Sequence, residues 1–512
     1  MPELIAAPAW SSYEWWPFDG RLWWKRARMA SPDTSSPPDS SMITSGRVAL
    51  IAVAVVLLAD FMELLDATIV SVAAPEIMSE LGASDSAIQW TVAGYTLAMG
   101  AALITGGRLG DQFGRRRAFL GGLSGFAVAS VLCALAPSPE VLIATRVLQG
   151  LAGGLMVPQV FGIIRSSLPP AARAKAFGAY GAVLSLASVA GPLLGGFLVD
   201  ADLFGLGWRA IFWVNIPIAI IGLILGARYL PESAAEDRPR LDVLGALLGA
   251  VTAVLVLLPL VQGREWGWPW WGFAMMVCSL LTGGLFLLRG RRVSARGEQP
   301  VFDPALLAVR SFSGGLAASM LFFGAVGSFF FLLSLYLQLG LGMSAWETGL
   351  VVVPYAAGAI VTSGVGVQFA GRAGRVLLVS GALVLAASQV VLLLVVRADA
   401  HPGYWLLALP LFVGGLGLGL TAPSLINVIL AGVPARAAGS AGGVLTTVSQ
   451  IGSAVGVAIL GGVFFAGVDG ALSAAAGFAG AFVAILPWQI GFYALAAALM
   501  LLLPARAAVH TD

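Results

Sequence analysis

Charged residues are scarce in this 512-residue sequence, and their scarcity excludes an ordinary soluble domain. Only 11% of the residues are Asp, Glu, Lys or Arg, whereas 59% are hydrophobic. Soluble domains carry about 25% charged residues. Because a helix satisfies its own backbone hydrogen bonds inside lipid, the composition predicts an all-α polytopic membrane protein.

Lysine and cysteine are almost absent, which narrows the chemistry. Lysine occurs only at Lys25 and Lys175, and neither stands in the Gly-Lys-Ser/Thr context of a phosphate-binding loop. The chain is therefore not its own ATPase, and uphill transport would use an ion gradient or a separate subunit. The two cysteines, Cys133 and Cys278, lie in apolar segments, so no disulfide framework is expected. We expect no cofactor, no metal, no enzymatic step and no nucleic-acid partner.

Fourteen apolar segments are long enough to cross a membrane, since a helical span needs about 20 apolar residues. They are 48–73, 87–107, 117–136, 141–164, 176–199, 211–230, 243–261, 270–288, 313–337, 349–370, 376–396, 404–429, 437–465 and 481–503. If the N-terminus lies inside, the outer loops receive only Arg209, Arg264 and Arg397. Because cytoplasmic loops collect Lys and Arg, this split predicts a plasma (inner) membrane protein with both termini in the cytoplasm.

The spans divide into two sets of six around a central pair. GGRLGDQFGRR at 106–116 has a faint copy, GVQFAGRAGR, at 366–375, and duplicated bundles are a recurrent transporter plan. The expected units are a tail at 1–47, a six-helix bundle at 48–230, two inserted helices with cytoplasmic linkers at 231–312, a six-helix bundle at 313–503 and a tail at 504–512. The first tail is either a disordered cytoplasmic segment or an over-long start, with Met29 or Met42 as the true initiator.

Three acids occupy the first span, and the other apolar segments carry none. Asp60, Glu63 and Asp66 follow one another at three-residue spacing, which places them on one stripe of a helix. Asp60 lies about 20 Å from the inner end of the span and Asp66 almost 30 Å. Because an ionised carboxylate in hydrocarbon is costly, and because burial and mutual repulsion favour a proton on one of them, the stripe predicts a proton or cation site.

A basic residue in the fourth span is the expected partner of Asp66. Arg146 lies about 9 Å from the outer end of that span, at the same depth as Asp66. A buried arginine stays charged and needs an anion, so we expect an ion pair, either structural or part of coupling. Asp60 and Glu63 have no basic partner in any span, which favours a functional role for them.

Several motifs in order carry a family resemblance. GRLGDQFGRRR at 107–117, RVLQG at 146–150, and Gly181 with GPLLGG at 191–196 are joined by LDATIV at 65–70, WRAIFWVNIP at 208–217 and YLQ at 336–338. Over about residues 48–465 the chain resembles the major facilitator superfamily (MFS), specifically the fourteen-span drug:proton antiporters of the QacA/EmrB type. It departs from the usual pattern at Ser71 and Ala74, and in having Asp60 and Glu63.

The resemblance implies an MFS fold of two six-helix bundles with two additional central helices, working as a monomer in the lipid bilayer. It assigns proton coupling to the motif containing Arg146 and Gln149, beside Asp60, Glu63 and Asp66. The loop 2–3 signature implies gating residues Gly107, Asp111, Gly114, Arg115 and Arg116. The antiporter motif implies Gly181, Gly191, Pro192, Gly195 and Gly196. Asp111 is expected to dock near 434–437, at the start of span 13.

The sequence therefore predicts a proton-coupled exporter of amphipathic or cationic small molecules such as drugs or antibiotics, acting by alternating access. The alternative is a dedicated exporter of one endogenous metabolite, for example an antibiotic or a siderophore. A sensor or membrane enzyme would need a sizeable soluble domain or a metal cluster, which the sequence lacks. The residues alone leave open which of Asp60, Glu63 and Asp66 carries the proton.

Overall fold

The structure is a computed structural model that describes residues 46–233, 242–298, 300–399, 401–430, 438–469 and 474–504. Its main compact unit runs from Arg47 to Asp512. The predicted tails lie outside the described residues apart from 46, 47 and 504. The same holds for residues 234–241 of the first predicted linker.

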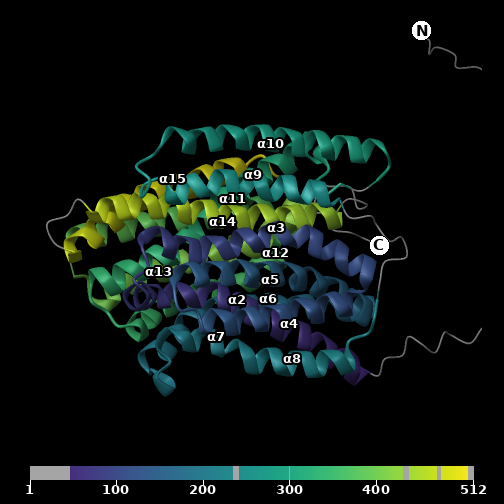
Figure 1. Cartoon of the computed structure of the whole chain (residues 1–512), viewed down its shortest axis with the longest axis horizontal. Helices are drawn as coiled ribbons and strands as arrows, with labels where there is room; N and C mark the ends of the chain where they lie inside the picture. Colours follow the sequence, from purple (N-terminus) through teal and green to yellow (C-terminus); the bar gives the residue numbers. More distant parts are fainter. Residues whose placement is uncertain are drawn as a thin grey trace, which may run out of the picture. The chain divides into compact units, whose positions relative to one another are not determined.

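The regular elements in the described part of the chain are all helices, and the long ones run side by side (Figure 1). The first group is α2 (Gly46–Leu81), α3 (Asp85–Phe113), α4 (Arg115–Ala134), α5 (Pro139–Ser167), α6 (Pro170–Asp200), η2 (Leu203–Gly205), η3 (Gly207–Arg209), α7 (Ala210–Trp213) and α8 (Asn215–Tyr229). The central pair is α9 (Val243–Gln262) and α10 (Trp270–Ala295), followed by η4 (Pro304–Ala308). The last group is α11 (Arg310–Leu335), η5 (Tyr336–Gly340), α12 (Ala345–Ala398), α13 (Tyr404–Leu430), α14 (Ala438–Asp469) and α15 (Ala474–Met500).

Thirteen of the described helical stretches are long and apolar enough to cross a membrane. The predicted span 176–199 falls in α6, whose described apolar stretch is Ala190–Asp200. The chain is therefore a multi-pass membrane protein with thirteen to fourteen apolar helices, and the count of fourteen stays a prediction. We name the two ends of the helices by their loops: the arginine-rich end holds residues 108–117 and 289–296, and the arginine-poor end holds residues 82–84 and 201–209.

Two helix boundaries differ from those expected. α2 continues past 73 to Leu81, with Pro75 inside it, because the loss of one backbone donor is tolerated where neighbouring helices enclose the chain. Spans 349–370 and 376–396 are two helices that share the label α12 and meet at a kink at Ala373, where φ is −135° and ψ is 27°. The turn between these two spans is therefore tighter than the sequence indicated.

We call α2–α8 the first bundle and α11–α15 the second bundle. α3 packs on α5, and α4 packs on α5 and α8; in the second group α12 packs on α13 and α15, and α11 packs on α14 and α15. Two seams join the groups, α6 against α12 and α3 against α14. Glycines permit the close approach: a Cβ on Gly456 of α14 would lie 2.0 Å from the carbonyl oxygen of Gly324 in α11. Such small-residue contacts are the usual means of helix association in membranes.

The α9–α10 hairpin and the segment that follows α10 are bonded to the two ends of α3. α9 contacts α3 and α14, whereas α10 packs chiefly on α9 and is otherwise exposed. At the arginine-poor end, Arg264 pairs with Asp85, and Glu265 accepts a hydrogen bond from the N–H of Ser86 at 3.3 Å. At the arginine-rich end, the guanidinium of Arg108 donates to the carbonyl of Pro300.

Candidate functional site

The three acids of α2 are all buried in the first bundle. Relative exposure is 1% for Asp60, 2% for Glu63 and 0% for Asp66. Their spacing places them along one stripe of α2, facing side chains from α3, α5 and α6. The stripe predicted from the sequence is therefore an interior feature, enclosed by protein.

Asp66 forms the expected ion pair with Arg146 of α5. The Arg146 Nη1–Asp66 Oδ2 distance is 2.5 Å, and both side chains are buried. Gln149, one turn further along α5, donates to Asp66 Oδ1 at 2.9 Å, and Arg146 also donates to Gln149 Oε1 at 2.6 Å and to the carbonyl of Thr91 at 3.2 Å. A buried charge pair persists only when its remaining donors and acceptors are satisfied, and this one is densely bonded.

Two neutral residues complete this network, and neither was assigned a role from the sequence. Asn215, at the start of α8, donates to Asp66 Oδ1 at 2.7 Å, and Ser130 of α4 accepts from Gln149 at 2.8 Å and from Asn215 at 3.2 Å. Asn215 lies inside the motif at 208–217. A polar amide within an apolar span was the feature of the sequence that could have marked it as a site residue. Ser130 offered no signal, because a serine in a membrane helix usually bonds its own backbone.

Tyr95 of α3 connects Glu63 to the ion pair. Its hydroxyl donates to Glu63 Oε1 at 2.9 Å, and the guanidinium of Arg146 lies 4.0 Å from the centre of its ring. That distance is within range of a cation–π interaction. Glu63 and Arg146 therefore share one aromatic neighbour but form no direct ion pair.

Asp60 is the least satisfied of the three acids. The hydroxyl of Tyr180 in α6 donates to its carboxylate, and its Oδ1 atom is buried without a hydrogen-bond partner. Among the described residues, no arginine or lysine forms an ion pair with Asp60 or Glu63. An unpaired buried carboxylate is costly in its ionised form, so these two positions are suited to taking up a proton or a cation.

The loop 2–3 signature lies at the arginine-rich end. Asp111, near the end of α3, pairs with Arg115 at 2.8 Å, and Arg116 donates to the carbonyl of Ala227. Gly114 has a φ of +104° between α3 and α4, a conformation that favours glycine. Gly107 lies on α3, where an added Cβ would lie 3.5 Å from Pro158.

Asp111 is predicted to dock against the start of span 13. Residues 434–437, its expected partner segment at the start of span 13, lie outside the described residues. The contact stays a prediction.

The antiporter motif packs α6 against two helices. An added Cβ on Gly191 would lie 1.8 Å from Thr68 Oγ1, and one on Gly195 would lie 2.7 Å from Ile69, so both glycines bring α6 onto α2. Gly196 faces the second bundle instead, where a Cβ would lie 2.3 Å from the carbonyl oxygen of Ala345. Gly181 lies in α6, but its surroundings fall outside the described residues.

The α6–α12 seam is closed at the arginine-poor end. Gly349 of α12 meets the carbonyl of Pro192, 2.7 Å from where a Cβ would stand. The carboxylate of Asp200 accepts hydrogen bonds from the N–H groups of Ala345 and Trp346 at 3.1 and 3.2 Å. These N–H groups begin α12 and have no partner within the helix, so Asp200 links the two bundles through a helix N-terminus.

Two acids outside the spans have lowered pKa values. Burial raises the pKa of Asp242, but hydrogen bonds from Arg289 at 2.6 Å and from the N–H of Gly245 outweigh it and hold the pKa below its ordinary value. Burial likewise raises the pKa of Glu265, and hydrogen bonds from Ser86 and Ser84 lower it by more. Both groups are ionised at neutral pH; Asp242 joins the start of α9 to α10, and Glu265 joins the α9–α10 loop to α3.

Comparison with known proteins identifies the family. Residues 56–457 match the Major Facilitator Superfamily. The chain is 43% identical over 420 residues to the "Probable actinorhodin transporter" of Streptomyces coelicolor, covering 81% of this chain and 72% of that protein. It is 35% identical to the "Tetracenomycin C resistance and export protein" of Streptomyces glaucescens (80% and 74% covered) and 32% identical to the "Multidrug resistance protein Stp" of Mycobacterium tuberculosis (80% and 75% covered).

Solved structures agree on the fold. A "POT family peptide transporter" crystallised in an auto-inhibited form has a TM-score of 0.64 at 16% identity, covering 89% of this chain and 96% of that one. A "D-xylose-proton symporter" has a TM-score of 0.62 at 15% identity, with 89% and 98% covered. The family match, the extent of the similarity and the shared helical fold lead to one conclusion: the chain belongs to the Major Facilitator Superfamily and is a membrane transporter, not an enzyme.

Proposed function

We propose that this chain is a proton-coupled antiporter that exports amphipathic or cationic small molecules, such as drugs or antibiotics, by alternating access. The names of its relatives support export and resistance. The fourteen-span QacA/EmrB-type architecture with both termini in the cytoplasm belongs to the same proposal, as do the two six-helix bundles at 48–230 and 313–503. In this orientation the arginine-poor end faces outward.

The observation that carries the proposal is the pair of buried carboxylates without a cation partner, Asp60 and Glu63. Each is enclosed in the first bundle, and each has a single tyrosine hydroxyl as its described donor. The ionised form is stable there only with a counter-charge. A proton and a cationic substrate would therefore compete for the same negative charge, and that competition is sufficient for antiport.

Asp66 is assigned a different task within this proposal. Its two oxygens already accept hydrogen bonds from Arg146, Gln149 and Asn215. Protonation of Asp66 would oppose all three donors. We therefore assign proton exchange to Asp60 and Glu63, and we assign to Asp66 the positioning of Arg146 beside Tyr95, which bonds Glu63.

Alternating access requires the contacts at the arginine-poor end to break and re-form. The candidates are Gly196 against Ala345, the Asp200 bonds to the start of α12, and a hydrogen bond of 2.8 Å from Gln338 to the carbonyl of Val72. All three join the first bundle to the second. Loading of the acids from one side and release to the other would follow a rocking motion of the bundles.

The test is transport by the purified chain in proteoliposomes with an imposed pH gradient. Asp60→Asn and Glu63→Gln should abolish gradient-driven uptake of a cationic dye while leaving membrane insertion intact. Glu140→Gln, which alters an exposed acid at the start of α5, is the matched control and should transport normally. Full gradient-driven transport by both Asp60→Asn and Glu63→Gln would place coupling elsewhere.

A second candidate is a dedicated exporter of one endogenous metabolite. It is favoured by two relatives that are named for single compounds, at 43% and 35% identity. A competition assay separates the two candidates: unrelated cations should inhibit efflux by a broad exporter and should leave efflux by a dedicated exporter unchanged.

A further inference from the structure

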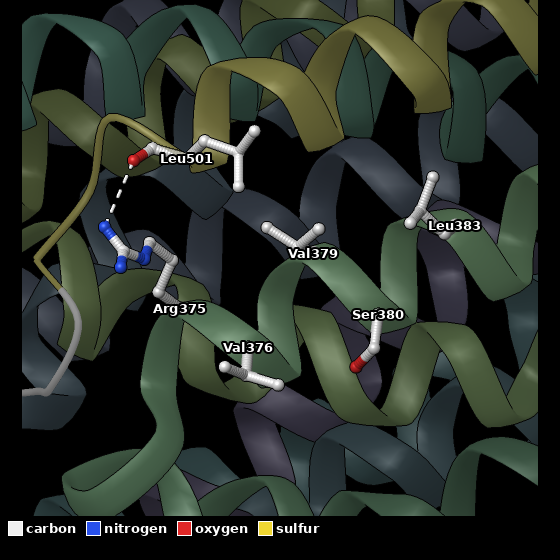
Figure 2. Close-up of a pocket in the computed structure, with 6 residues that line it drawn as sticks. All are labelled: Arg375, Val376, Val379, Ser380, Leu383 and Leu501. Carbon is white, nitrogen blue, oxygen red and sulfur yellow. Dashed lines mark hydrogen bonds between the residues drawn. The ribbon is translucent and has the colours of Figure 1, made fainter.

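A pocket of about 350 Å³ opens on the second bundle at the arginine-rich end. It lies between the second half of α12 and the end of α15. Figure 2 shows Arg375 at one end of the pocket and Leu383 at the other, with Val379 between them. Val376, Ser380 and Leu501 complete the lining. The pocket is separate from the acidic site, which is built on α2 of the first bundle.

Arg375 is the charged group of this pocket, and the described residues engage only part of its hydrogen-bonding capacity. Its Nη1 donates to the carbonyl of Leu501 at 3.4 Å, which accounts for one of the five donors of a guanidinium. No carboxylate among the described residues pairs with it. Because arginine is always protonated in proteins, the pocket presents a permanent positive charge beside apolar walls.

The pocket has a charged end near the end of the membrane span and apolar walls deeper along it, which is the order of head group and acyl chain in a lipid molecule. Arg375 lies two residues after the kink at Ala373, at the start of the second half of α12. Leu383 lies eight residues further on, which is about 12 Å deeper along the helix axis. Val376 and Leu383 are 66% and 51% exposed, so the apolar wall faces the surrounding membrane. A charged end and an apolar groove leading inward fit an amphiphile with an anionic head.

We propose that this pocket binds an anionic phospholipid, with its phosphate on Arg375 and one acyl chain along Val379 and Leu383. Guanidinium groups recognise phosphate oxygens in bidentate geometry, and basic pockets between membrane helices bind anionic head groups. A small soluble anion would leave the apolar walls of Val376, Val379 and Leu383 unused, so the lipid is the occupant that uses the whole pocket.

The test counts lipids retained by the delipidated full-length protein in native mass spectrometry. The probes are phosphatidylglycerol and phosphatidylcholine with the same acyl chains. The wild type should retain phosphatidylglycerol preferentially, and Arg375→Gln should reduce its retention by about fivefold, the effect of one surface cation near an anionic lipid. Arg397→Gln is the matched control, because Arg397 is exposed at the other end of the same helix.

Two further measurements keep the proposal open to refutation. Val379→Phe fills the groove without changing its charge and should lower phosphatidylglycerol retention, with thermal melting used to confirm folding. Glycerol phosphate should fail to displace the lipid. Equal retention by Arg375→Gln and Arg397→Gln, or displacement by glycerol phosphate, would show that this pocket is not an anionic phospholipid site.

Discussion

Replacing Asp66 by asparagine tests the buried network most directly, because no orientation of the new amide fits it. Asp66 Oδ2 accepts from Arg146, and Oδ1 accepts from Gln149 and Asn215. An asparagine has one acceptor and one NH₂ group. In either orientation the NH₂ group faces a donor, so at least one N–H in a fully buried site loses its partner.

The magnitude follows from the charge that is left behind. Arg146 is 1% exposed, and it would keep only neutral acceptors, Gln149 Oε1 and the carbonyl of Thr91. Removing one partner of a buried ion pair costs about 3–5 kcal/mol. The unfolding equilibrium constant should therefore rise by roughly two to four powers of ten.

The assay is equilibrium unfolding in mixed bicelles, combined in a double-mutant cycle. Asp66→Asn, Arg146→Gln and the double variant are compared with the wild type. The double variant should be less destabilised than the sum of the singles, by about 1–3 kcal/mol, because its second change removes the orphaned charge. The exposed pair of Glu80 and Arg209 is the control, and Glu80→Gln should cost at most about 1 kcal/mol.

The reasoning is refuted if Asp66→Asn unfolds like Glu80→Gln, or if the two single effects add without coupling. Either result would mean that Arg146 does not depend on Asp66 for its counter-charge.

Three further results are expected. Gly196→Ala should force α6 away from Ala345 and lengthen spin-label distances between α6 and α12 at the arginine-poor end, whereas Gly121→Ala, with nothing within 4 Å of the added Cβ, should not. The pKa of Glu265 is lowered in the folded state, so the stability it contributes is complete at neutral pH and is lost as pH falls below the ordinary glutamate value of about 4.3. Glu265→Gln should therefore make the melting temperature depend less on pH over that acidic range. A pH profile equal to that of the wild type would contradict this. Asp111→Asn breaks a partly exposed ion pair and should change the free energy of unfolding by at most about 1 kcal/mol. A large loss of transport in the same variant would therefore indicate a role in gating, as the predicted docking of Asp111 requires. Normal transport would count against that docking.

The membrane-spanning plan and the ion pair were accessible from the sequence because both depend on simple geometry. Helices rise by a constant 1.5 Å per residue, so the depths of Asp66 and Arg146 could be compared without knowing how the helices pack. The pairing of these two residues is confirmed by the 2.5 Å contact. Their part in coupling, like that of Asp60 and Glu63, stays a prediction.

The rest of the site depends on helix rotation and packing, which residue spacing does not determine. Asn215, Ser130 and Tyr180 are neutral, so no charge rule points to their partners. The hydrogen bond between Glu265 and Ser86 joins the α9–α10 loop to the first turn of α3, which is far away in the sequence. The kink at Ala373, where the two helices of α12 meet without an intervening loop, was also not predicted, because an apolar pattern indicates where helices lie in the membrane but not how tightly two of them are joined.

The loop between α9 and α10 is exposed at the arginine-poor end and is bonded to the first turn of α3. Glu265 and its exposed neighbour Trp268 stand in the loop between α9 and α10, outside the apolar layer. Ser86, which Glu265 binds, lies nine residues from Tyr95 on α3, about 14 Å along one rigid helix. If Glu63 couples transport as proposed, an antibody fragment that displaces this loop should shift α3, whose Tyr95 donates to Glu63 of α2, and should inhibit transport without competing with any substrate.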